Sequence, residues 1–447
     1  MRIFFLALFL STLFLPACAV FKTHDARAAL KIKHEVEHSP VFLKSFTGFT
    51  LLDPVKGKTL ADFNGAHYFT PASNTKIFTL TTCLAVLGDS VPTFVWQENK
   101  QWLSITPIGD PTFLHPKFQA WQSSYQKLQT TNKNIYIDIW HSPDIQPLGP
   151  GWAWDDADLD FSAENSFFPL YGNLKRIYKD ENGALQVEPK IWQKYLDVET
   201  YWHDSLRTID DTLIISNGNL SKHFETWLPL KHSVDYIERL LLDTLHKPIA
   251  YGNKVGDFER VLNTSPKYWY STPLDTVLRR MMYQSDNFIA EQMLLVCGEF
   301  LQMHPNEKAL KDTLIQWMLD STLSNLPQRP KWVDGSGLSR YNMATPQSIA
   351  QVLFKLWKEQ PKQRLLSLFP AGGADGTLKD WYAGKNGKPY VWAKTGSMGG
   401  VQCLSGYVVC KSGKTLIFSF MHNNFVGSGR PWKVEMQHIL EQVRDRF

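Results

Sequence analysis

The alternation of apolar and polar residues predicts the elements near the start of the chain. Residues 45–60 are expected to form two strands, because Asp-Pro and Gly-Lys pairs interrupt a β-like run. A helix is expected to begin at Ser73, since apolar residues recur at steps of three and four from Ile77 to Leu87. Gly88 marks the end of that helix.

The rest of the chain divides into a β-like middle and a mixed final part. From about 95 to 260, short β-like runs, Trp-rich segments and turn signals alternate, which predicts one or two mostly β modules. Helical periodicity returns at residues 271–296 and 345–357. Residues 388–424 contain three strand-like runs, and a last helix is expected from about Pro431.

The first twenty residues, MRIFFLALFLSTLFLPACAV, have one Arg, a long apolar run and small residues after a proline. This pattern is typical of a secretory signal peptide, and a membrane-anchor helix is the alternative because the run approaches spanning length. Both imply export. Residues 15–18 resemble the lipobox of bacterial lipoproteins, with Cys18 lipidated. Cleavage at an Ala-x-Ala site, 17–19 or 26–28, is the competing interpretation.

Length and composition exclude some functions. The chain has 447 residues, too many for one ordinary core, and its net charge of +4 argues against a nucleic-acid partner. The other cysteines show no metal-ligand spacing, so neither a metal nor a cofactor is expected. We interpret them as small buried apolar residues. A disulfide between Cys403 and Cys410 stays open.

A Ser-x-x-Lys pair carries the first candidate chemistry. Ser73 and Lys76 lie at the start of the predicted helix, one turn apart on the same face. The spacing alone is weak, because Ser124 and Lys127 repeat it.

Two later motifs favour the pair Ser73 and Lys76 over the pair Ser124 and Lys127. A Ser-Asp-Asn triplet at 285–287 interrupts the helical region, and a Lys-Thr-Gly triplet at 394–396 lies at a strand end. In this order the three motifs are the set found in penicillin-binding proteins and serine β-lactamases. Their order and settings indicate an enzyme of that kind.

The residue types suggest a role for each position. Ser73 is the candidate nucleophile and Lys76 its base, which requires a neutral amine. The pKa of Lys76 must then be lowered, by burial and by the charge of Lys394. Ser285 is placed to relay a proton to the leaving amine. Asn287 is placed to hold the substrate amide and the Lys76 amine.

The Lys-Thr-Gly motif is suited to binding the terminal carboxylate of a substrate. Lys394 would contribute its charge and Thr395 a hydrogen bond. Gly396 lets that strand approach the substrate closely. The backbone N–H groups of Ser73 and Ser397 would form the oxyanion hole.

A long gap separates the first two motifs. About a domain's length of chain lies between Ser73 and Ser285, and the stretches PASNTK, GDPTF, GPGWAWDD, DGSGLSRYN and GGADGTLKD accompany the motifs. In these features the chain resembles the class C low-molecular-weight penicillin-binding proteins, the D-alanyl-D-alanine carboxypeptidases of peptidase family S13.

The resemblance implies an α/β (α+β) fold with a β-lactamase/transpeptidase-like domain and an inserted β-rich part. The expected divisions are a signal segment at 1–29, the transpeptidase-like domain at 30–95 and 261–447, and the insertion at 96–260. The resemblance also implies that Arg340, in the GLSR stretch, lies near the substrate.

The implied activity is a serine D-alanyl-D-alanine carboxypeptidase in the periplasm or cell envelope. Peptidoglycan stem peptides would acylate Ser73, release D-Ala and then be hydrolysed, and β-lactams would acylate the same serine. Cleavage of D-Ala–diaminopimelate crosslinks is also implied. The alternatives are a serine β-lactamase and a non-catalytic receptor for wall peptides or β-lactams. The oligomeric state stays open.

Overall fold

The computed structural model describes residues 24–138, 145–199, 206–207, 213–216, 220–230, 234–252, 266–303, 310–384 and 387–447. The predicted signal segment at 1–29, including Cys18, lies outside the described residues except for 24–29. Those six residues begin helix α1 (His24–His38), in which Ala28 and Ala29 are buried.

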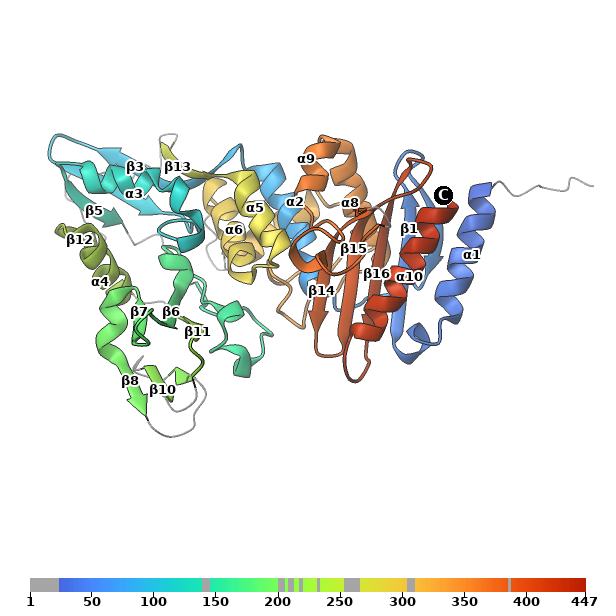
Figure 1. Ribbon diagram of the computed structural model, residues 1–447. Coiled ribbons are helices and arrows are strands. Elements are labelled where there is room, and N and C mark those ends of the chain that lie inside the picture. The colour runs from blue at the N-terminus through green and yellow to red at the C-terminus, as the bar shows by residue number, and fades with distance from the viewer. Residues whose placement is uncertain are drawn as a thin grey trace, which may run out of the picture.

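A five-stranded antiparallel sheet, in the order β14-β15-β16-β1-β2, lies at the centre of the larger unit (Figure 1). Its strands are β1 (Phe46–Asp53), β2 (Lys58–Phe63), β14 (Val391–Met398), β15 (Val401–Val409) and β16 (Thr415–Asn423). Phe46 on β1 pairs with Asn423 on β16, so the two ends of the chain build one sheet.

Helices cover both faces of this sheet, and its three middle strands, β1, β15 and β16, are buried along almost their whole length. On β16, Phe418 and Phe420 pack toward α1 and α10 (Arg430–Arg446), while Ile417 and Met421 pack toward a helical layer on the other face. The helices of that layer are α2 (Lys76–Val86), α5 (Leu274–Tyr283), α6 (Asn287–Phe300), α7 (Leu310–Asp320), α8 (Pro346–Glu359) and α9 (Lys362–Ser367).

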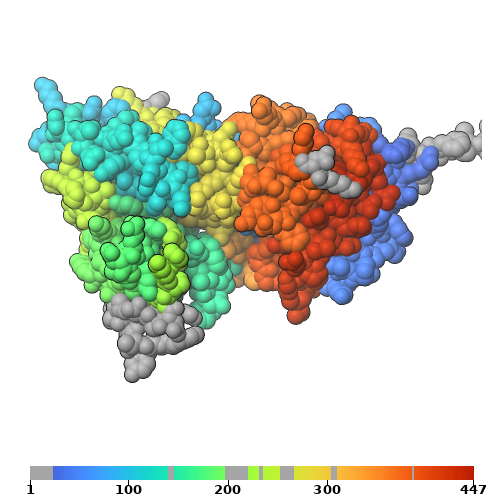
Figure 2. All heavy atoms as spheres, in the orientation of Figure 1, coloured from blue at the N-terminus to red at the C-terminus, as the bar shows by residue number. Residues whose placement is uncertain are grey.

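The insertion packs around a hydrophobic cluster of its own and forms a lobe beside the larger unit (Figure 2). Its described residues form a five-stranded mixed sheet, two three-stranded sheets and two α-helices. These elements are β3 (Ser90–Glu98), β4 (Trp102–Pro107), α3 (Ser123–Thr130), β5 (Asn134–Asp138), β6 (Leu174–Lys179), β7 (Leu185–Glu188), β8 (Leu196–Glu199), β9 (Leu206–Arg207), β10 (Leu213–Ser216), β11 (Glu225–Pro229), α4 (Val234–Leu245), β12 (Ile249–Gly252) and β13 (Tyr268–Pro273).

Strand pairing favours an insertion wider than the predicted range of 96–260. Strand β13 pairs with β3, and β3 pairs with β4, so both outer segments belong to the insertion's sheet. We therefore propose boundaries near residues 90 and 273. The sequence pattern does not indicate these wider boundaries, because β3 begins only a few residues after the end of α2 and no change of composition marks the transition.

The elements expected around the motifs are present, including the strand pair near residue 50, the interrupted helix and the final three strands. The four cysteines in the described part of the chain are buried and free, as expected, and no disulfide joins Cys403 to Cys410. Among the described residues, no helix combines the length and apolar character needed to cross a membrane.

Helix α1 was not predicted, and its packing can be tested. Ile32 is fully buried in the cluster with α10, whereas Leu30 on the same helix is 48% exposed. Ile32→Ala should lower the free energy of unfolding by about 2–5 kcal/mol because it leaves a cavity. Leu30→Ala should change it by less than about 0.5 kcal/mol. Chemical denaturation measures both; equal small effects would show that α1 is not part of this core.

Candidate active site

The turn that carries Ser73 is a short 3-10 segment (Ala72–Thr75) leading directly into α2. Ala72, just before Ser73, has a φ of 46°, in the left-handed region that residues other than glycine seldom adopt. The Ser73 side chain is half-buried, and Lys76, the first residue of α2, is fully buried. Ser73 is therefore at the surface of the turn, and its partner lies beneath it.

Two glycines from distant parts of the sequence pack against this turn. A Cβ atom on Gly337, whose φ is 88°, would lie 2.0 Å from the Ala72 carbonyl oxygen. A Cβ atom on Gly396 would lie 2.6 Å from the Pro71 carbonyl oxygen. In the structure Gly396 allows β14 to approach the Ser73 turn closely, and its predicted role in close approach of the substrate stays a prediction.

The Lys76 amine makes three hydrogen bonds. Its Nζ donates to Ser73 Oγ at 3.1 Å, Asn287 Oδ1 at 2.6 Å and the Ser336 carbonyl oxygen at 2.7 Å. The two carbonyl-type oxygens can only accept, so each requires an N–H from the amine. In the neutral amine only two N–H groups remain, and the lone pair is then directed at Ser73 Oγ. This arrangement suits removal of the Ser73 proton.

Burial lowers the pKa of Lys76 to about 8. The charges of Asp334, Glu291 and Asp286 act in the opposite direction and keep the pKa from falling further. The predicted lowering is therefore present, with burial as its largest cause. The predicted repulsion between the two lysines acts on Lys394, whose pKa is lowered well below its usual value by burial and then by the Lys76 charge.

The second hydrogen-bonded pair joins Lys394 on β14 to Ser285. Lys394 Nζ donates to Ser285 Oγ at 2.9 Å and to the Thr395 carbonyl oxygen at 2.9 Å. Ser285 lies between α5 and α6 with a φ of 57°. Asp286 caps α6 by accepting from the Ile289 N–H at 3.1 Å, which fixes the start of the helix that carries Asn287.

The remaining predicted residues lie along β14 and the loop opposite its end. Thr395 Oγ1 donates to Thr377 Oγ1 at 3.0 Å, and Ser397 Oγ donates to Gln402 Oε1 at 3.0 Å. Arg340 is exposed, and its Nη1 lies 3.5 Å from the Gly399 carbonyl oxygen, just past the end of β14.

The sequence analysis did not identify several groups that form hydrogen bonds to the predicted site residues and fix their positions. Asn287 Nδ2 donates to the Phe161 carbonyl oxygen at 3.0 Å, which orients the Asn287 side chain. Ser336 supplies an acceptor for Lys76, and the buried Asp334 accepts from the Gly337 N–H at 2.8 Å and thereby shapes the same loop. The DGSGLSR stretch was a visible signal for the loop. A backbone carbonyl such as that of Phe161 leaves no signal in a sequence.

A cavity of about 260 Å³ lies between the insertion and the Ser-Asp-Asn turn. Ser285 and Asn287 line it on one side, and His115, Lys117 and Trp227 on the other. The inserted lobe also contacts the loop at 334–342, because Trp152 Nε1 donates to Asp334 Oδ2 at 2.9 Å. The insertion therefore forms one wall of the candidate site.

The central sheet, the helical layer and the paired Ser-Lys contacts define a transpeptidase-like protein with an inserted lobe. The sequence profile of the D-Ala-D-Ala carboxypeptidase 3 (S13) family matches residues 29–182 and 217–443, and the chain belongs to this family. It is accordingly a peptidase, and the β-lactamase and receptor alternatives are not favoured.

Individual relatives agree with this assignment. The chain is 23% identical to D-alanyl-D-alanine carboxypeptidase DacB of Haemophilus influenzae, over 90% of each protein. It is 24% identical to D-alanyl-D-alanine carboxypeptidase of Actinomadura sp., over 87% of this chain and 79% of that one. The crystal structure of penicillin-binding protein 4 from Haemophilus influenzae has the same fold, with a TM-score of 0.70 at 18% identity over 93% of this chain and 99% of that chain.

The contact between Gly337 and the Ser73 turn yields a prediction. Gly337→Ala should destabilise the protein by about 1–3 kcal/mol through backbone strain. Because the new methyl group would displace Ala72, it should also slow acylation of Ser73 on the order of 10²-fold. The measurements are thermal unfolding and the rate of labelling by a fluorescent penicillin.

Gly413→Ala is the matched control. Gly413, on the β15–β16 turn, also has a positive φ, 86°, but a methyl group added there would have no atom within 4 Å. This variant should share the backbone strain and keep the full acylation rate. Equal acylation rates in the two variants would contradict the proposed packing role of Gly337.

Proposed function

We propose that this protein is a serine D-alanyl-D-alanine carboxypeptidase that acts on peptidoglycan stem peptides through an acyl-enzyme on Ser73. The observation that carries the proposal is the Lys76 amine, buried and hydrogen-bonded to Ser73 Oγ at 3.1 Å. Two carbonyl oxygens occupy its other hydrogen-bonding positions. A neutral amine held in this way is a general base for the serine hydroxyl.

In the proposed reaction, Ser73 Oγ attacks the carbonyl carbon of the penultimate D-Ala while its proton passes to Lys76. The C–N bond of the tetrahedral intermediate then breaks, and the proton held by Lys76 passes by way of Ser285 to the leaving amine, which returns Lys76 to its neutral form. Water hydrolyses the resulting ester with Lys76 again as base. The backbone N–H groups of Ser73 and Ser397 are the proposed oxyanion donors.

The terminal carboxylate of the substrate is proposed to bind at Lys394 and Thr395. Burial, followed by the charge of Lys76, lowers the pKa of Lys394, and a bound carboxylate would favour its charged form. Substrate binding would therefore supply a counter-ion for this buried amine. Arg340, exposed beside the end of β14, is proposed to contact a more distant part of the stem peptide.

A second substrate class is favoured by the cavity beside Ser285. Because this serine is the proposed donor to the leaving amine, the cavity offers room for a leaving group larger than D-Ala. We therefore propose cleavage of D-Ala–diaminopimelate crosslinks as an additional activity. β-Lactams are proposed as covalent inhibitors at the same serine.

Peptidoglycan as substrate implies a location in the cell envelope. We propose that the first residues are an export signal that ends before α1. Cleavage at the Ala-x-Ala site of residues 26–28 would remove the first turn of α1, including the buried Ala28. Processing at 17–19, or lipidation of Cys18, leaves α1 intact and is the version we propose.

The nucleophile is tested by covalent labelling. After incubation with benzylpenicillin, the intact mass should rise by one penicilloyl group, and peptide mapping should place it on Ser73. Ser73→Ala should lose both the adduct and D-Ala release from diacetyl-Lys-D-Ala-D-Ala. Ser124→Ala is the matched control, because Ser124 has the same spacing to a lysine but lies on α3 in the insertion. Equal D-Ala release by Ser73→Ala and the wild type would remove Ser73 from the mechanism.

The base is tested by the pH dependence of acylation. The pKa of Lys76 is lowered to about 8, and only the neutral amine accepts a proton. Acylation should therefore rise about tenfold per pH unit below pH 7 and level off above about pH 8. Lys76→Arg, which stays charged, should lose about 10²–10⁴-fold. A rate that is flat between pH 6 and 10 would contradict this assignment.

A further inference from the structure

The orientation of the Lys76 lone pair depends on two acceptors, and each acceptor has its own support. Asn287 Oδ1 is held because the other end of that amide donates to the Phe161 carbonyl oxygen. The position of Ser336 is fixed by a hydrogen bond from its backbone N–H to Glu291 Oε1 at 2.8 Å. Thus one residue, Ser336, faces Glu291 with its N–H and Lys76 with its carbonyl oxygen.

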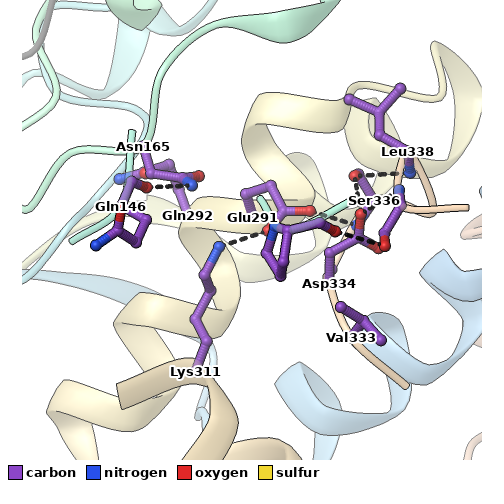
Figure 3. A network of polar contacts seen from close by, with 12 residues as sticks. Gln146, Asn165, Glu291, Gln292, Lys311, Val333, Asp334, Ser336 and Leu338 are labelled. Carbon is purple, nitrogen blue, oxygen red and sulfur yellow. Dashed lines mark hydrogen bonds and ion pairs between the residues drawn. The ribbon is translucent and has the colours of Figure 1, made fainter. Parts of the chain in front are cut away.

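Glu291 lies on α6, one turn after Asn287, and is fully buried. Its other carboxylate oxygen, Oε2, pairs with Lys311 Nζ of α7 at 2.7 Å (Figure 3). Burial acts to raise the pKa of Glu291, but the charge of Lys311 and the hydrogen bonds from Lys311 and Ser336 outweigh it and lower the pKa. Glu291 is therefore a buried carboxylate in its charged form.

We propose that Glu291 is a positioning residue of the catalytic site, which holds the Ser336 carbonyl oxygen against the Lys76 amine and contributes a fixed negative charge to the surroundings of that amine. The inference rests on the proposed role of Lys76 as base. Glu291, which lies outside the three motifs, would then control both the position and the proton affinity of the Lys76 amine.

The charged groups around Lys76 come from three elements. Asp286 and Glu291 face it from α6, Asp334 from the loop at 334–342, and Lys394 from β14. Two of the acidic groups have basic partners, Arg280 for Asp286 and Lys311 for Glu291. Asp334 is held chiefly by neutral donors, and burial followed by the Glu291 charge raises its pKa. Glu291 thus combines a lowered pKa with a direct hydrogen bond to the residue that Lys76 contacts.

Two substitutions separate charge from position. Glu291→Gln keeps an oxygen that can accept from the Ser336 N–H but removes the charge. The midpoint of the pH profile of acylation should then move toward lower pH by about 0.5 pH unit. At pH 6.5 the acylation rate, as a fraction of the variant's own maximal rate, should therefore rise about threefold. Glu291→Asp keeps the charge but shortens the reach. Its midpoint should stay near that of the wild type while its maximal rate falls about tenfold or more.

Glu299→Gln is the matched control, because Glu299 is a mostly buried acid two turns further along α6 with a pKa raised by burial to about 7. It should leave the profile unchanged. If Glu291→Gln unfolds because Lys311 loses its partner, the double variant Glu291→Gln/Lys311→Met removes both charges and retains the Ser336 contact. Its midpoint should still move toward lower pH. Folding is checked by thermal unfolding, and acylation by stopped-flow labelling with a fluorescent penicillin between pH 5.5 and 9.

The outcomes distinguish this inference from the proposed function. If the adduct on the wild type maps to a residue other than Ser73, the proposed function fails first. If Ser73 is labelled and the wild-type rate rises with pH, the proposed function stands. In that case, the pH profiles of acylation decide on Glu291. If the folded Glu291 variants have the same midpoint and maximal rate as Glu299→Gln, the proposed role of Glu291 is wrong.

Discussion

A primary amine buried beneath a serine hydroxyl, with two carbonyl oxygens beside it, governs this site. Charged, the Lys76 amine has three N–H groups for three acceptors, and every bond is satisfied. Neutral, it can satisfy only the two carbonyl oxygens, and its lone pair faces Ser73 by elimination. The surroundings therefore fix both the protonation equilibrium and the direction of proton transfer. Neither would follow from proximity of the two side chains alone.

Several neighbouring elements fix the positions of the hydrogen-bond acceptors around the Lys76 amine. The inserted lobe supplies the Phe161 carbonyl that orients Asn287, and α6 supplies the carboxylate beneath Ser336. Strand β14 brings the second amine, Lys394, to Ser285. Burial of two amines in one site favours the loss of a proton from at least one of them. The acidic groups lie around Lys76, so Lys394 is the amine that gains most from an incoming carboxylate.

The sequence was sufficient for the motifs and their elements because the chemistry of each is carried by side chains at short spacing. It placed Ser73 at a helix start, Asn287 after a helical break and Lys394 on a strand, and it predicted the lowered pKa of Lys76. It could not supply Glu291, because an acid within an apolar helix becomes informative only when its tertiary partners are known. Helix α1 was missed because its first residues were assigned to the signal segment. The wider boundaries that we propose for the insertion rest on strand pairing between β3 and β13, which a local sequence pattern does not encode.

The pairing of β1 with β16 has a consequence for how the protein reaches its folded state. The register that places Phe46 opposite Asn423 joins the earliest strand to the latest, so the topology has high contact order and slow closure is expected. The inserted lobe, by contrast, packs around a hydrophobic cluster of its own. Lys394 lies on β14, at the edge of the same sheet, so the second amine can reach Ser285 only once the C-terminal strands have joined the strands from the start of the chain.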